Sequence, residues 1–504
     1  MPFLSWINDK DARNQAKNVP FHILQNAGTY GDPSAENLVV HGDNLLALRA
    51  LLPFYRGKVK CIYIDPPYNT GSAFEHYDDN LEHSQWLSMM YPRLQLLREF
   101  LADDGTIWVS IDDDEQAYAK VLMDEVFGRG SFVSTIVWQK RTSPDMRATI
   151  SDAQEYIHVY AKNKGLFKEV RNRLPLSKKQ LASYKNPDND PNGPWTSTDC
   201  TAQAGHATAS QFYVLTTPAG RVIELPPSLC WRFTEEKMME EIKAGRIWLG
   251  KDGKGIPRKK TYLKDSAGVV PWSWWSNDEV GHSQEAKKEA VSLNPDSVFG
   301  TPKPERLIQR ILHIATNPGD LILDSFLGSG TTAAVAHKMG RRYIGIEMGE
   351  HAKTHCIPRL QKVIDGEQGG ISASVNWQGG GGFRFFELGE PAFDKWGCIN
   401  PEVDFKTLAA FVWMSETGEA AEPAESPFLG VSNGTAYYLL YAPEGSSNDP
   451  SAGVLTFATM QELLKNHPFD GPKVVFAEAC AGLAEQELKA HQITFKQIPT
   501  DLLR

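Results

Sequence analysis

The chain has 504 residues, 41% hydrophobic and 23% charged, a composition typical of a soluble globular protein with two or three domains. No signal-peptide pattern and no run of about 18 apolar residues occurs, so we expect a cytoplasmic protein without a membrane segment. The six cysteines are scattered without a C-x-x-C pair, which argues against a disulfide framework or a zinc site.

The formal net charge of −10 is unevenly distributed along the chain. From residue 377 to the end there are 17 acidic and 8 basic residues, whereas Trp138–Lys185 contains 11 basic and 4 acidic residues. Lys and Arg side chains displace counterions from phosphates, so the negative total does not exclude a nucleic-acid partner.

Hydrophobic strands that end in carboxylates alternate with helices in two parts of the sequence. The predicted strands are residues 59–65, 105–112, 320–324 and 342–347, and the predicted helices are residues 86–97 and 333–339. This alternation predicts a mixed α/β sheet with helices on both faces. Ligands of such sheets bind outside the carboxyl ends of the strands, where these acidic residues lie.

The segment between these two parts lacks regular periodicity and is rich in Gly, Pro, Asn, Lys and Trp. We therefore expect residues 1–140 and 272–378 to form the two halves of one catalytic domain, with residues 141–271 as an inserted module. Four consecutive glycines precede an acidic C-terminal domain of the α+β type, residues 379–504. The Glu-, Ala- and Pro-rich stretch Glu416–Pro427 is predicted to be a flexible loop.

The most specific motif is Asp65-Pro66-Pro67-Tyr68, directly after a predicted hydrophobic strand. Two consecutive prolines fix the backbone and carry no N–H, so the Asp65 and Pro66 carbonyls and the Asp65 carboxylate can act as acceptors in a pocket. The Tyr68 ring can stack on a planar base. Methylation of an exocyclic amine on an extruded base requires such acceptors and such an aromatic face. A turn without a catalytic role is the alternative.

A second motif, Asp324–Thr332, predicts a glycine-rich loop between a strand and a helix, where Gly328 and Gly330 let a ligand approach the backbone. Such loops also bind nucleotides in dehydrogenases or are structural turns, so the motif alone leaves the ligand open. Glu347 ends the next predicted strand and is placed to bind ribose hydroxyls. No G-x-x-x-x-G-K-[ST] motif occurs, so the sequence does not support a P-loop ATPase.

Together these motifs resemble those of the β-group of amino-methyltransferases, in which D-P-P-Y precedes F-x-G-x-G, and most closely those of the Mod subunit of type III restriction-modification systems. The similarity is dense over residues 35–140 and 272–365. The matching segments are His41–Leu45, Tyr63–Gly71, Ser110–Glu115, Pro302–Ile308 and Leu323–Thr332. The resemblance implies a circularly permuted Rossmann-like methyltransferase sheet with a target-recognition domain at residues 141–271.

The resemblance also implies S-adenosylmethionine as cofactor, no metal, and a role for individual residues. The implied catalytic residues are Asp65, Pro66, Pro67 and Tyr68. The implied cofactor-binding residues are Asp43, Lys303, Asp324, Phe326, Gly328, Ser329, Gly330, Thr331 and Glu347. Asp43 would contact the adenine of the cofactor, with a helix cap as the alternative. Lys303 would lie near the methionine carboxylate, with a place before an inward-packing helix as the alternative.

The implied reaction is methylation of adenine N6 within a specific sequence of double-stranded DNA; methylation of cytosine N4 uses the same geometry. A DNA-recognition subunit that guides a separate nuclease is an alternative from another class. Basic residues of the insert, such as Lys140, Arg141 and Arg258-Lys259-Lys260, are candidates for phosphate contacts or for a solvated basic surface. The acidic C-terminal domain is expected to contact protein, through a homodimer or a restriction and translocation (Res-type) subunit.

Overall fold

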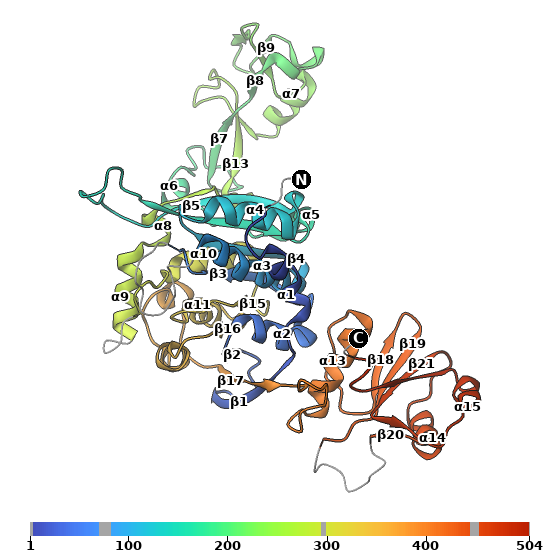
Figure 1. The fold of residues 1–504 in the computed structure, drawn as a ribbon. Coiled ribbons are helices and arrows are strands. Elements are labelled where there is room, and N and C mark those ends of the chain that lie inside the picture. Colours follow the sequence, from blue (N-terminus) through green and yellow to red (C-terminus); the bar gives the residue numbers. More distant parts are fainter. Residues whose placement is uncertain (1–3, 70–81, 294–298, 444–452, 503–504) are drawn as a thin grey trace. The chain divides into compact units, whose positions relative to one another are not determined.

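The computed structural model describes residues 4–69, 82–293, 299–443 and 453–502, and the chain forms two compact units (Figure 1). The first unit comprises the residues before Arg173 and after Pro271, and the second comprises Arg173–Pro271. Within the described ranges, no helix combines the length and the apolar character needed to cross a bilayer.

Ten strands of the described residues form the main sheet of the first unit. Their order across the sheet is β1 (His22–Gly31), β17 (Gly382–Pro391), β2 (Leu38–His41), β16 (Arg342–Glu347), β15 (Leu321–Asp324), β3 (Val59–Ile64), β4 (Leu101–Ile111), β6 (Gln154–Ala161), β5 (Phe132–Gln139) and β14 (Trp274–Trp275). The neighbours from β17 to β4 pair in parallel, whereas β1, β6 and β5 pair antiparallel with β17, β4 and β6. The mixed α/β sheet confirms the predicted fold class.

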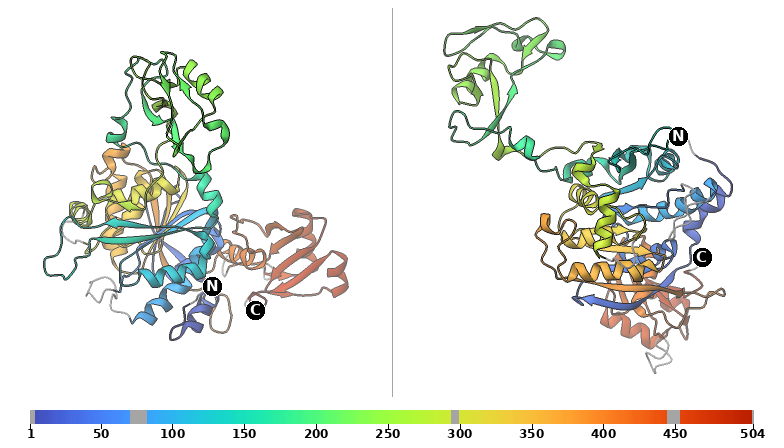
Figure 2. Two further views of the ribbon diagram at one scale, coloured as in Figure 1. Left: turned by 90° about the horizontal axis from the view of Figure 1, so that it is seen from above. Right: turned by 90° about the vertical axis from the view of Figure 1, so that its left-hand side faces the viewer.

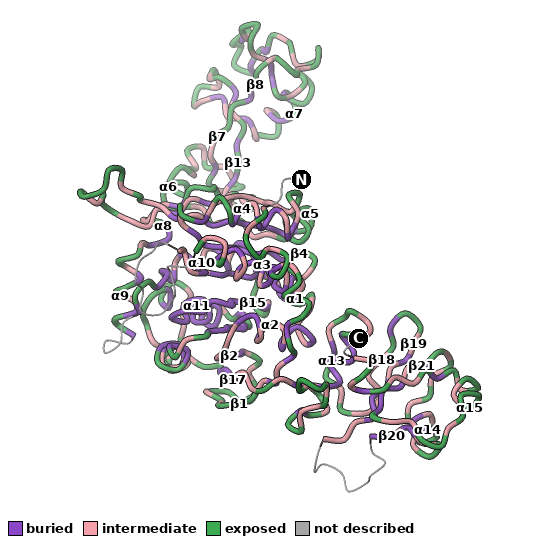
Figure 3. The backbone as a smooth tube through the Cα atoms, in the orientation of Figure 1, coloured by how far each residue is buried: buried purple, intermediate pink, exposed green. Residues whose placement is uncertain are grey.

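Helices lie on both faces of this sheet (Figure 2). One face packs against α1 (Asp9–Asn18), α2 (Asn44–Tyr55), α3 (His83–Phe100) and α4 (Gln116–Phe127), and the other carries α10 (Glu305–Ala315), α11 (Thr331–Lys338) and α12 (Ile357–Ile364). Side chains alternate along a strand, so Ile62 and Ile64 of β3 join the core cluster of α2 to α4, whereas Cys61 and Tyr63 do not. These strands and the helix faces toward them are buried (Figure 3).

The carboxyl ends of five parallel strands meet at one edge of the sheet. Since β2, β16, β15, β3 and β4 run in the same direction, the residues that end or directly follow them come together there. The acidic residues at these positions are Asp43, Glu347, Asp324, Asp65 and Asp112. The D-P-P-Y motif and the glycine-rich motif therefore lie at the same edge of the sheet, although they are far apart in the sequence.

The second unit contains α6 (Lys178–Leu181), β7 (Trp195–Asp199), β8 (Thr201–Gln203), β9 (Leu215–Thr216), β10 (Val222–Ile223), β11 (Leu229–Trp231), α7 (Glu235–Lys243), β12 (Ile247–Trp248) and β13 (Arg258–Tyr262). Trp231 and Met238 are buried in its own small core. The unit begins 32 residues later than the boundary expected at residue 141. The reason is that β5 and β6 form a hairpin that pairs with β4 in the main sheet, so residues 141–172 belong to the first unit.

The main sheet also continues past the boundary expected at residue 379, because β17 inserts between β1 and β2. The elements after β17 are α13 (Phe405–Thr417), β18 (Phe428–Ser432), β19 (Thr435–Leu439), β20 (Val454–Leu455), α14 (Phe457–Asn466), β21 (Lys473–Ala477), β22 (Ala479–Cys480), α15 (Glu485–Ala490) and β23 (Ile493–Gln497). The first unit also contains α5 (Lys164–Val170), α8 (Asn277–Val280) and α9 (Ser283–Leu293). Strands β18, β19, β21 and β23 form a second sheet around buried residues such as Val475 and Phe476. The segment predicted to be a loop, Glu416–Pro427, comprises the last two residues of α13 and the connection from α13 to β18.

Candidate active site

The turn Asp65–Tyr68 follows β3 directly, at the carboxyl edge of the sheet. Pro66 is buried, and the indole N–H of Trp86 on α3 donates a hydrogen bond to the Pro67 carbonyl oxygen at 2.7 Å. The next residue, Asn69, has a φ of 61°, in the left-handed region where asparagine is tolerated. Strand, prolines and Trp86 together fix where Asp65 and Tyr68 lie.

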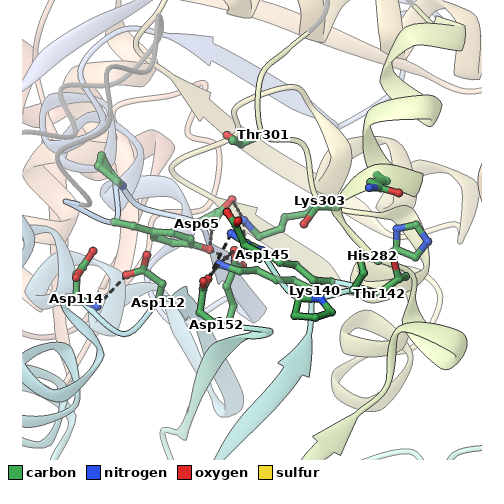
Figure 4. Close-up of a pocket in the computed structure, with 18 of the residues that line it drawn as sticks. Asp65, Asp112, Asp114, Lys140, Thr142, Asp145, Asp152, His282, Thr301 and Lys303 are labelled. Atoms are coloured by element: carbon green, nitrogen blue, oxygen red, sulfur yellow. Dashed lines mark hydrogen bonds and ion pairs between the residues drawn. The ribbon is translucent and has the colours of Figure 1, made fainter. Parts of the chain in front are cut away.

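Asp65 and Lys303 belong to a compact cluster of charged and polar side chains (Figure 4). The Tyr68 hydroxyl lies 2.6 Å from Oδ1 of Asp65 and 3.0 Å from Oε2 of Glu155 on β6. The Nζ of Lys303 lies 2.6 Å from Oδ2 of Asp65 and 5.0 Å from the centre of the Tyr68 ring. The carboxylate of Asp65 is therefore held from two sides, by a hydroxyl and by an ammonium group.

The two charged members of this pair influence each other's ionisation. Burial raises the pKa of Asp65; Lys303 opposes that rise and Glu155 adds to it. Burial by itself would lower the pKa of Lys303, but the carboxylates of Asp65 and Glu155 hold it above its ordinary value. Lys303 is therefore an ammonium group at neutral pH and can pair with either carboxylate.

This cluster lines a cavity of about 730 Å³, within the size range of small-molecule sites. Its walls come from the Asp65–Tyr68 turn, the β5–β6 hairpin, His282 and Thr301. Burial raises the pKa of Asp112, at the end of β4 in the same wall, to about 7. The cavity has room for a purine base, with acceptors and an aromatic ring in its wall.

The glycine-rich loop lies beside this cavity, after β15. Asp324 is buried, accepts a hydrogen bond from the Phe326 N–H at 3.0 Å, and has a pKa that burial raises to about 7. Gly328 and Gly330 have φ values of 56° and 80°, which explains why glycine is needed at both positions. A Cβ at Gly330 would lie 3.4 Å from Cα of Cys356, an ordinary van der Waals contact, so the positive φ rather than lack of space favours glycine there.

Glu347, at the end of β16, anchors this loop. Its carboxylate accepts hydrogen bonds from the N–H groups of Gly328 at 2.7 Å and Gly349 at 3.0 Å. Burial would raise the pKa of Glu347, but His351, 2.9 Å away, and these N–H groups hold it below its ordinary value. An ionised carboxylate therefore lies at the strand end where a ribose-binding residue was predicted.

A second, much smaller cavity of about 30 Å³ lies between the loop and the D-P-P-Y turn. Its wall contains Phe326, Gly328, Ser329 and Thr331 of the loop and shares Asp65, Thr301 and Lys303 with the larger cavity. Just before Phe326, the Oγ of Ser325 is buried and has no hydrogen-bond partner among the described residues. Asp324 is also part of the wall, and its carboxylate suits a ligand with hydroxyl and amino groups, such as a nucleoside.

Two predicted cofactor residues have other contacts in the structure. Asp43 caps α2, because its Oδ1 accepts from the N–H groups of Leu45 and Leu46, and its Oδ2 lies 3.0 Å from Arg93. This is the helix-cap alternative; a contact with the cofactor remains a prediction. Lys303 pairs with the carboxylate of Asp65 while also lining the small cavity, so its proximity to the methionine carboxylate likewise remains a prediction.

Two residues of the cluster were not predicted as site residues. Glu155 is the one acidic residue of β6, and its place in a mostly buried strand was the available signal. Lys140 was considered for phosphate contacts, but its side chain is only 14% exposed and its Nζ lies 3.4 Å from Oε1 of Glu155. Similarly, Lys260 of the second unit is buried and pairs with Asp188 and Asp190, which removes it from the predicted basic surface.

Residues 59–357 match the model of a family described as DNA methylase. Among curated proteins, the chain is 38% identical over 332 residues to the type III restriction-modification enzyme StyLTI Mod subunit of Salmonella typhimurium, covering 60% of this chain and 49% of the relative. It is 31% identical over 398 residues to the EcoPI Mod subunit of Escherichia phage P1, covering 66% and 60%. It is 33% identical over 322 residues to the type II methyltransferase M.EcaI of Enterobacter cloacae, covering 62% and 66%.

The chain thus spans between about half and two thirds of the length of these relatives. The family match covers more than half of the chain and includes both the Asp65–Tyr68 turn and the glycine-rich loop. The predicted family is therefore confirmed: this chain belongs to the DNA methylase family.

Proposed function

We propose that this protein transfers a methyl group from S-adenosylmethionine to the exocyclic N6 of adenine within a specific sequence of double-stranded DNA. The observation that carries the proposal is that Asp65 and Lys303 line both cavities. A base in the larger cavity and a methyl donor beside the glycine-rich loop would meet at these two residues.

The residues of the D-P-P-Y turn have distinct roles in this proposal. The target adenine leaves the duplex and stacks on the Tyr68 ring, while Asp65 and the Pro66 carbonyl accept hydrogen bonds from its amino group. These bonds orient the nitrogen lone pair away from the ring. Transfer would form the N–C bond as the methyl–sulfur bond breaks and S-adenosylhomocysteine leaves, and the amino group would then lose one proton, which Asp65 can accept and pass to solvent.

The cofactor site consists of the residues around the glycine-rich loop. When bound, S-adenosylmethionine supplies an electrophilic methyl group on a positively charged sulfur. In our proposal Glu347 accepts hydrogen bonds from the ribose hydroxyls of the cofactor, and Asp43 contacts the adenine of the cofactor. Asp324, Phe326, Gly328, Ser329, Gly330 and Thr331 line the pocket, and Lys303 faces the methionine carboxylate.

Transfer of labelled methyl groups to unmethylated bacterial genomic DNA, followed by nucleoside mass spectrometry, tests this function. N6-methyladenine is the expected product. N4-methylcytosine would replace the base assignment but keep the class of reaction, since both bases present a similar amino group. No labelled nucleoside, with a folded chain and saturating cofactor, would contradict the proposal.

The remaining parts of the chain are proposed to bind the partners. The second unit, Arg173–Pro271, is proposed to read the DNA sequence. Residues 392–504 are proposed to contact protein, either in a homodimer or with a restriction and translocation subunit. Two of the relatives are named as Mod subunits of type III restriction-modification enzymes, which supports this assembly. Light scattering of the full chain, alone and with unmethylated DNA, tests self-association; a monomer in both conditions would contradict the homodimer.

A further inference from the structure

The Tyr68 hydroxyl has two carboxylate acceptors but only one proton to donate. It lies 2.6 Å from Asp65 Oδ1 and 3.0 Å from Glu155 Oε2. A tyrosine hydroxyl can donate one hydrogen bond at a time, so the shorter contact is the one it makes here. Glu155 is thus a second acceptor that the hydroxyl can reach by a small rotation.

Lys303 has the same choice between these carboxylates. Its Nζ lies 2.6 Å from Asp65 Oδ2 and 3.6 Å from Glu155 Oε2. Glu155 in turn lies 3.4 Å from Lys140, so this carboxylate has an ammonium group on each side. Such pairing is what a largely buried charge requires.

Glu155 is held in place by the main sheet, opposite the Asp65–Tyr68 turn. It belongs to β6, where its backbone pairs with Trp138 of β5, and its side chain is 9% exposed. Tyr68 instead follows two prolines in a turn at the end of β3. A carboxylate fixed in this way can orient a neighbouring hydroxyl and ammonium group.

Each oxygen of the Asp65 carboxylate already accepts one hydrogen bond, from Tyr68 and from Lys303. An amino group of a base at Asp65 would share the carboxylate with these two donors and compete with them for its charge. Glu155 is within reach of both donors and offers them another acceptor.

We propose that Glu155 is a positioning residue that takes over the Tyr68 hydroxyl and the Lys303 ammonium group when the target base engages Asp65. The inference rests on the proposed function. Without the carboxylate of Glu155, Tyr68 and Lys303 stay on Asp65 and compete with the amino group of the base. Among the described residues, no hydrogen bond or ion pair joins the glycine-rich loop to Glu155, so cofactor binding should change only through Lys303 and therefore by little.

Glu155→Gln tests this proposal in the full chain, because glutamine preserves the shape and removes the charge. With unmethylated bacterial genomic DNA as substrate, we expect kcat to fall about ten- to hundred-fold, the range of a hydrogen bond to a charged group, and the KM for the cofactor to stay within a few-fold. Glu155→Ala should lose at least as much activity.

The matched control is Asp113→Asn. Oδ1 of Asp113 lies 2.9 Å from the hydroxyl of Tyr156, the residue after Glu155, but Asp113 is exposed and does not line the cavity. Asp113→Asn thus changes a tyrosine–carboxylate hydrogen bond of the same kind outside the cavity. The kcat of this variant should stay within about two-fold of that of the unsubstituted chain, as for most surface changes.

The pH profile separates positioning from a general loss of structure. Glu155 raises the pKa of Asp65, so its removal should lower that pKa and move the acid limb of kcat/KM to lower pH, even as the maximum falls. The groups that face Asp65 from the surrounding elements are Lys303, Glu155, Tyr68, Tyr63 and Asp324. Except for Glu155, all are unchanged in the variant.

A double variant provides the last arm. If Glu155 acts partly through the Tyr68 hydroxyl, the losses in Tyr68→Phe and Glu155→Gln should be less than additive when combined. A normal kcat with an unmoved acid limb in Glu155→Gln, or fully additive losses, would overturn the inference. The unsubstituted chain shows whether such a result refutes only the role of Glu155 or the proposed function as well. If the unsubstituted chain methylates DNA, only the role of Glu155 is refuted.

Discussion

The Nζ of Lys303 lies 2.6 Å from Oδ2 of Asp65, although the two residues are 238 positions apart in the sequence. This ion pair joins the D-P-P-Y turn after β3 to the segment before α10. The ion pair connects the two halves of the sheet that the inserted unit separates in the sequence. It also places a positively charged ammonium group beside Asp65, the residue proposed to bind the amino group of the base.

Lys303→Met should therefore alter the pH dependence of methylation. Lys303 opposes the rise in the pKa of Asp65, so its loss should raise that pKa further and move the acid limb of kcat/KM to higher pH, opposite to Glu155→Gln. Profiles between about pH 5 and 9 provide the measurement. Lys353→Met, at an exposed pair with Glu387, is the control. An acid limb that moves to lower pH would show that Lys303 does not act on Asp65.

Asp65→Ala should abolish methyl transfer, with a loss of more than about 100-fold in kcat, as expected when a preorganised polar contact to the reacting group is removed. Cofactor affinity should remain within a few-fold, because the carboxylate serves the base. Calorimetric titration with S-adenosylmethionine is the check. A folded variant that no longer binds the cofactor would assign Asp65 to the wrong ligand.

Glu347→Ala should raise the KM of the cofactor about ten- to hundred-fold, because it removes both the proposed ribose contact and the anchor of the Gly328 N–H. Glu350→Ala is the neighbouring control, since that side chain is 77% exposed. Steady-state kinetics with varied cofactor gives the comparison. Equal KM values in the two variants would remove Glu347 from the site.

Gly330→Val should also raise the cofactor KM. A side chain at a φ of 80° costs about 1–2 kcal/mol of stability. Gly340→Val pays a similar cost at a φ of 69°, but a Cβ there would meet nothing within 4 Å. Thermal unfolding and cofactor KM of both variants separate strain from a local effect. A KM that rises equally in both would mean that Gly330 matters only for stability.

Much of the fold was predictable because its signals are local. The predicted strand at residues 342–347 has the bounds of β16, and the D-P-P-Y and glycine-rich motifs lie where runs of apolar residues end. The boundary at residue 141 differs from the structure because β6 is assigned to the main sheet only by its pairing with β4 and β5. Likewise, Glu155 meets Tyr68 across 87 residues, a contact that periodicity does not encode.

Exchange of residues 173–271 for the matching unit of a relative with another target should change the methylated sequence and leave the chemistry intact. This segment is compact by itself, whereas an exchange from residue 141 would replace β6 and Glu155. Mapping of methylated sites in both chimeras is the measurement. Methylation of the original site by the 173–271 chimera would locate recognition in the first unit.

Base-resolution sequencing of DNA from cells that express the full chain tests the central claim most directly, with cells that express Asp65→Ala as the control. We expect N6-methyladenine at one recurrent sequence in the first sample and none in the second. Methylation that persists in Asp65→Ala, or no modified base in DNA from cells with the unsubstituted chain, would contradict the account.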